Sequence, residues 1–177
     1  FKADVIGGSV SGLGAAVGAS VAIATIEGET KAYSKGHIGA VAPVGSLDID
    51  AGSTADMYAQ SITANIGAGA VGVTVAKTTF KPTVLASISA GSVDAAGIVN
   101  VDANANGDIE SHAPGGSGGG VAVAAMIAQA FVQGSVLAFV GSGSTIKAGT
   151  LNIKATETSV LDSDIKVYAV GLGAGGG

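Results

Sequence analysis

The segment from Asp102 to Glu110 holds the residues whose types and spacing come closest to a metal site. Oxygen-bearing side chains occupy its positions 1, 3, 5 and 9, as Asp102, Asn104, Asn106 and Glu110, and Gly107 occupies position 6. Hard Ca²⁺ is bound by several oxygens that a sharp turn brings together, and this spacing matches three-quarters of a calcium loop. The bidentate glutamate of position 12 is replaced by Ala113. The sequence therefore predicts either a weak calcium site, as the one candidate cofactor, or an ordinary turn at Asn106-Gly107.

The other groups that could carry chemistry are better interpreted as structural. The run from Pro114 to Gly120 lacks the Gly-Lys-Ser/Thr ending of a phosphate loop, so we interpret it as a linker or as tight packing. His37 and His112 have no partner triad in the sequence and are interpreted as solvated. Recurrent carboxylates such as Asp48 and Asp102 fit a solvated face better than the groove of a polysaccharide lyase or hydrolase. We therefore expect no catalytic residue and no enzyme activity.

A repeat of 52 residues runs through the chain and must position these groups. The pentapeptides that begin at Leu47, Val99 and Leu151 correspond, and glycines precede all three at the same offset. Such a period indicates one structural unit stacked on itself, with each copy burying its apolar face against the next. The length corresponds to about 3.4 units in one segment, 1–177. The units are placed approximately at 1–10 (partial), 11–63, 64–115, 116–170 and 171–177 (partial).

Alternation of apolar and polar residues with period two predicts that each unit is built from strands. Leu47 and Ile49 share one face, and the same holds for the matching residues of the later units, so we expect internal columns Leu47-Val99-Leu151 and Ile49-Val101-Ile153. Fifty-two extended residues would trace roughly 170 Å. Because that perimeter is large for a compact coil, we expect two or three coils per repeat.

Composition limits the classes of partner. The chain has 30 Gly, 47% hydrophobic and only 4% aromatic residues, which favours thin β layers filled by small and β-branched side chains. The net charge is −5 and there is no Lys/Arg cluster, so nucleic acid is not expected as a partner. The uncharged stretch 121–140 could span a bilayer as a helix, but its repeat mates carry charges and Pro82. We therefore predict strand there, and no membrane span.

The runs 17–24, 30–33 and 45–51, with their counterparts 69–76 and 149–155, resemble the repeat regions of leukotoxin-type filamentous adhesins of Gram-negative bacteria. These are haemagglutinin-like exported β-helix repeat proteins. The resemblance covers essentially the whole chain and consists of low-complexity spacing. It implies a right-handed parallel β-helix in an extracellular or bacterial cell-surface protein, and it implies no toxin activity.

The sequence as a whole predicts an all-β, right-handed parallel β-helix (β-solenoid) that serves as a non-catalytic adhesin stalk or matrix fibre. Its partners would be neighbouring repeats or further copies of itself end to end, and a ligand on a host-cell or matrix surface reached through outward residues such as Tyr58 and Tyr168. One alternative is a self-assembling filament subunit, because an open coil end exposes unpaired backbone groups. A less favoured alternative is a polysaccharide-acting β-helix enzyme.

Overall fold

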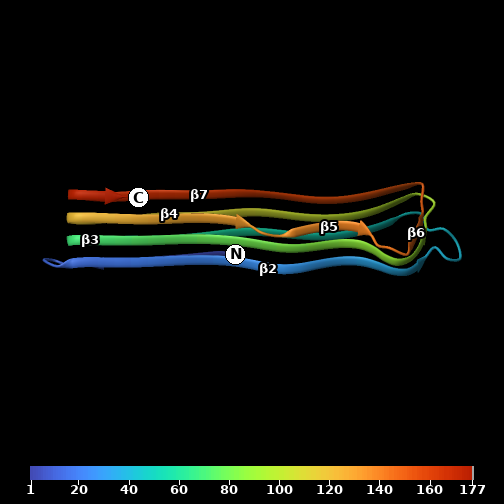
Figure 1. The fold of residues 1–177 in the computed structure, drawn as a ribbon, viewed down its shortest axis with the longest axis horizontal. Coiled ribbons are helices and arrows are strands. Elements are labelled where there is room, and N and C mark those ends of the chain that lie inside the picture. Colours follow the sequence, from blue (N-terminus) through green and yellow to red (C-terminus); the bar gives the residue numbers. More distant parts are fainter. Residues whose placement is uncertain (177) are drawn as a thin grey trace.

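The chain folds almost entirely into long strands stacked in a flat body (Figure 1). The computed structural model describes residues 1–176, and Gly177, in the last partial repeat unit, lies outside the described residues. The strands are β1 (Lys2–Val10), β2 (Ala15–Ile38), β3 (Leu47–Asp94), β4 (Ile98–Val132), β5 (Ser135–Val140), β6 (Ser144–Lys147) and β7 (Thr150–Gly176). Residues 1–176 contain no helix, and all strand pairs are parallel. The expected all-β class is confirmed, and the parallel sheet of long strands is of the β-solenoid type.

From Leu47 onward, β3, β4 and β7 pair in the 52-residue register that the repeat predicts. The first turn does not: Lys2 pairs with Tyr58 and Ala15 with Gly69, at offsets of 56 and 54 residues. Leu47 pairs with Val99 and Val99 with Leu151, and the column of Ile49, Val101 and Ile153 pairs in the same way. The stacking of the two predicted columns is therefore confirmed, but the columns are internal only in part, since Leu151 and Ile153 of the last turn are 42% and 45% exposed. Because strand partners lie one full repeat apart, each repeat forms a single turn. The expectation of two or three coils per repeat is wrong. Each turn consists of two long extended segments, here called arms, which together account for its long perimeter.

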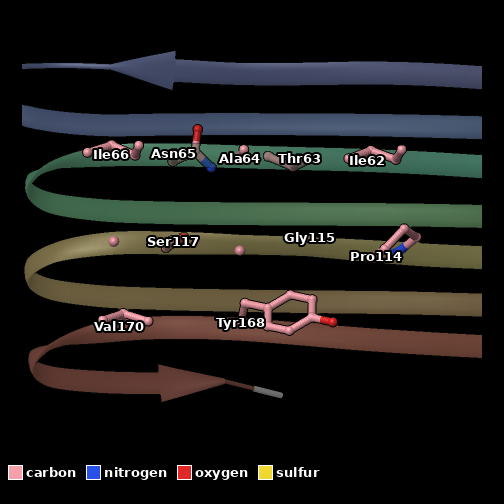
Figure 2. A pocket seen from close by; sticks show the side chains of 12 residues that line it. Ile62, Thr63, Ala64, Asn65, Ile66, Pro114, Gly115, Ser117, Tyr168 and Val170 are labelled. Atoms are coloured by element: carbon pink, nitrogen blue, oxygen red, sulfur yellow. The ribbon is translucent and has the colours of Figure 1, made fainter.

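The two arms of each turn face each other as two layers. In β3, odd-numbered residues are buried from Ile49 to Gly67, apart from the half-buried Ser53, whereas even-numbered residues are buried from Ala70 to Ile88. This change of phase marks a chain reversal, which Figure 2 shows directly after Ile66. The first layer contains β1 with 47–66, 98–118 and 150–170, and the second contains β2 with 69–94, 121–147 and 173–176.

Two hydrophobic clusters fill the space between the layers. The first includes Met57, Phe80 and Ile109, and the second includes Val84 and Val101. All five are at most 1% exposed. Most other members are alanines, so the layers pack closely around a few large side chains.

Hydroxyl side chains replace hydrophobic ones in the interior near the reversals. Ser20 Oγ lies 2.7 Å from Ser61 Oγ and also hydrogen-bonds with Thr63. Asn65 is 1% exposed, and its Oδ1 accepts a hydrogen bond of 2.8 Å from the Ser9 hydroxyl. Buried polar groups of this kind need such partners to offset the loss of water.

Residues 121–140 lie in β4, β5 and the short connection between them, as the charges of their repeat mates predicted. Their strand assignment is therefore confirmed. Within the described part of the chain, no helix has the length and apolar character needed to cross a membrane.

The glycines at one phase of the repeat stack directly on one another. Gly97 N donates to Gly45 O at 2.9 Å, and Gly149 N donates to Gly97 O at 2.8 Å. A Cβ added at Gly97 would lie 2.5 Å from Gly45 O, whereas a Cβ added at Gly45 would meet nothing within 4 Å. Equivalent positions of the repeat therefore differ in their need for glycine.

We predict that Gly97→Ala lowers the free energy of unfolding by about 1–3 kcal/mol, because the backbone of two turns must separate to admit the methyl group. The same change at Gly45 should shift it by no more than about 0.5 kcal/mol. Urea denaturation followed by circular dichroism measures both values. Equal effects of the two substitutions would contradict this stacking.

Candidate functional site

The four residues of the predicted calcium loop lie along one straight strand. Asp102, Asn104, Asn106 and Glu110 occupy alternate, outward positions of β4. Eight strand residues span roughly 26 Å, so the structure does not bring Asp102 and Glu110 together. Neither the loop nor the turn at Asn106-Gly107 forms, because Asn106 pairs in register with Thr54 on one side and Thr158 on the other. Among residues 1–176, no three His, Asp or Glu side chains are grouped to hold a metal ion. Calcium binding stays a prediction.

Polar side chains of successive turns form ladders on the outer face of the first layer. Asn100 Nδ2 donates to Asp48 Oδ1 at 2.5 Å, and Asn152 Nδ2 donates to Asn100 Oδ1 at 2.8 Å. Each amide thus donates toward the preceding turn. These exposed hydrogen bonds favour the same register as the buried columns.

A second set of side chains, here called the charged row, crosses four turns of this face. Its members are Lys2, Asp4, Tyr58, Glu110, His112, Asp162, Asp164 and Lys166. The Tyr58 ring stacks on the His112 imidazole, with centroids 5.0 Å apart and an interplanar angle of 30°. Lys2 Nζ lies 5.1 Å from the centroid of the Tyr58 ring. The row therefore joins aromatic, cationic and acidic groups that lie far apart in the sequence.

His112 lies between two carboxylates. Its Nε2 is 3.2 Å from Glu110 Oε2, and its Nδ1 is 3.8 Å from Asp164 Oδ2. The side chain is only 22% exposed, so the interpretation of His112 as a solvated residue is wrong. His37 is exposed as expected, with Nδ1 2.7 Å from Ser92 Oγ.

Each lysine of the charged row is paired with a carboxylate of its own strand. Lys166 Nζ lies 3.1 Å from Asp164 Oδ2, and Lys2 Nζ lies 2.9 Å from Asp4 Oδ2. The hydrogen bond to Asp164, and then its negative charge, raise the pKa of Lys166 above the ordinary value, and Asp4 acts in the same way on the pKa of Lys2. Both side chains therefore stay protonated and charged through the physiological pH range, and they lose the proton only in alkali.

Beside the charged row, toward the chain reversals, the same face is hollowed into an apolar groove of about 390 Å³ (Figure 2). Gly116 and Gly118 form its floor, because these outward strand positions carry no side chain. The walls are Ile62 and Ile66 from the preceding turn and Tyr168 and Val170 from the following one, and Pro114 closes the end toward the charged row. The groove therefore lies along one strand and spans three turns.

The two floor glycines differ in their structural role. A Cβ at Gly116 would lie 2.6 Å from Tyr168 O, so the close approach of the turns requires glycine there. A Cβ at Gly118 would meet only Val170 O, at 3.8 Å, which is an ordinary contact. The packing of the turns therefore does not require a glycine at 118, and its presence leaves the groove open.

The sequence does contain a signal for the groove. Counting one repeat back from Tyr168 gives Gly116, and a second repeat gives Ala64. With the strand alternation, this places Gly116 and Gly118 outward between larger neighbours. The relation of Gly116 to Ala64 and Tyr168 is not visible within the glycine run 114–120 alone.

No protein-family model, no curated protein and no solved structure matches this chain. Its own geometry thus defines its class, a parallel solenoid-like β protein of two facing layers. One outer face of this body carries the charged row and the apolar groove.

Proposed function

We propose that the chain is a structural, non-catalytic segment of an extracellular bacterial filamentous adhesin or matrix fibre, wound as a right-handed parallel β-helix. The observation that carries the proposal is the parallel pairing of each turn with the next, in a constant 52-residue register through β3, β4 and β7. Such a body transmits force along its stack and presents wide outer faces. Right-handed winding is supported by the general preference of parallel crossovers, about 98% of which are right-handed.

The location we propose, outside the cell or on the bacterial surface, rests on the resemblance of the repeat to exported adhesin repeats. The chain has no cysteine, so its cysteine content does not decide the compartment. A net charge of −5 and exposed amide ladders keep the outer face hydrated. The partners we propose are a ligand on a host-cell or matrix surface and neighbouring repeats or copies.

Small-angle X-ray scattering of the purified chain tests the scaffold role. The 24 residues of β2 span roughly 80 Å, so a monomeric slab should have a radius of gyration well above 20 Å. A compact globule of 177 residues would give about 16 Å. A value near 16 Å, or a glycan-cleaving activity that Glu110→Gln abolishes, would overturn the proposal.

The second candidate function, a filament subunit that stacks end to end, is favoured by unpaired strand edges at both ends of the stack. Among residues 1–176, β1 and β2 at one end pair only with β3, and at the other end β5 and β6 pair only with β3 and β7 only with β4, so each has one free edge. On β7, Leu161 and Ile165 are also 48% and 45% exposed. Polymers that electron microscopy shows at micromolar concentration, and that Leu161→Lys removes, would favour this candidate over the stalk.

A further inference from the structure

We propose that the apolar groove binds an extended cationic peptide segment of a partner protein. Aliphatic side chains of the segment lie over Gly116 and Gly118, and a Lys or Arg side chain reaches the charged row. The inference goes beyond the scaffold role, because it names a binding site on the chain and the class of ligand that this site takes.

The shape of the groove fits one extended chain. Its walls belong to turns on either side of the floor strand, so they lie roughly 9–10 Å apart, which is twice the spacing of neighbouring strands. Alternate residues of an extended peptide recur every ~6.6 Å, the same spacing as that between the two floor glycines. A pattern of apolar residues at every second position therefore matches the floor.

The lining decides against a sugar. The side chains of Ile62, Ile66, Pro114 and Val170 offer neither donors nor acceptors, and Tyr168 contributes one hydroxyl. A sugar ring seated there would leave most of its hydroxyls without partners, at a cost that aliphatic side chains do not incur.

Charge decides against an anionic lipid and in favour of a basic peptide. The charged row carries four carboxylates, Asp4, Glu110, Asp162 and Asp164, against two ammonium groups, and the chain as a whole has a net charge of −5. Lys166, in register with Pro114, is the member of the row nearest the groove, but its ammonium group is paired with Asp164, and the row keeps two more carboxylates than ammonium groups. An acyl carboxylate beside the row as a whole would be repelled. Gly116 and His112 are four residues, or roughly 13 Å, apart along the strand. A Lys or Arg four positions beyond the peptide residue that lies over Gly116 is therefore placed over the row.

The test uses chain 1–177 and a fluorescein-labelled peptide, Val-Thr-Val-Thr-Lys-Thr-Lys, in forward and reversed sequence. Fluorescence anisotropy should show saturable binding of at least one of them. Gly118→Val fills the groove and should weaken binding at least tenfold. Gly52→Val makes the same change at an outward position of the same face, where a Cβ meets nothing within 4 Å, and should leave binding unchanged.

Two further measurements change only charge, one on the protein surface and one on the peptide, so their results do not depend on whether a groove variant folds. Asp162→Asn removes one charge of the row and should weaken binding severalfold without a change in thermal stability. A peptide with Glu in place of both Lys should bind at least tenfold more weakly.

The proposal is overturned if neither peptide binds at millimolar concentration, if Gly118→Val and wild type bind alike, or if the Glu peptide binds equally well. Octanoate and a methyl glycoside serve as competitors. If either displaces the peptide at concentrations too low for the peptide itself to bind well, the groove is assigned to a lipid or a sugar instead. Scattering judges the scaffold role separately.

Discussion

Val101→Asp is expected to lower the free energy of unfolding by at least ~3 kcal/mol, a large fraction of the stability of an ordinary domain. Val101 is fully buried in the second hydrophobic cluster, between Ile49 and Ile153 of the adjacent turns. A carboxylate there would lose its water without gaining a partner. Urea denaturation followed by circular dichroism measures the loss.

Two controls make the Val101 result specific. Ile153→Asp places the same charge in the same column, but Ile153 is 45% exposed, so the loss should be less than half as large. Asn104→Asp changes an exposed, outward residue of the same strand and should have almost no effect. A Val101→Asp protein as stable as Asn104→Asp would show that the column is not buried.

Phe80→Ala is expected to cost about 3–5 kcal/mol, because it removes the largest fully buried side chain and leaves a cavity. Phe80 is 1% exposed and belongs to the same cluster as Met57 and Ile109, which come from different turns of the first layer. Its loss therefore weakens the contact between the two layers. The same denaturation experiment reports it.

Phe131→Ala is the matched control for Phe80. Phe131 lies one turn further on and is only partly buried, with Lys77 Nζ 5.2 Å from its ring centroid. Its removal should cost no more than about 1 kcal/mol. Equal losses at the two phenylalanines would contradict the placement of Phe80 between the layers.

Strand alternation and the repeat could predict the columns but not the path of the chain. Leu47, Val99 and Leu151 differ clearly in polarity from their neighbours, so both their face and their register follow from sequence. The number of coils per repeat depends on where the chain reverses. At 67–70 the change of buried phase falls on Gly and Ala, which carry no polarity contrast.

The candidate site was harder to predict because it is formed between turns. The calcium pattern at 102–110 is a local one, and pairing with two neighbouring strands holds the segment extended instead. His112 gains its contacts with Tyr58 and Asp164 only through the register of adjacent turns. The groove likewise requires glycines of one turn to be compared with Ile66 and Tyr168 of its neighbours.

The central claim is that one repeat makes one turn with two long, straight arms, and a single distance tests it most directly. The chain has no cysteine, so spin labels can be attached at Asp50→Cys and Ala64→Cys, both exposed positions of β3. Fourteen strand residues predict roughly 46 Å between the labels in a pulsed dipolar measurement. A distance below about 30 Å would mean that the segment 50–64 curves within a shorter coil, and would contradict the two-arm turn.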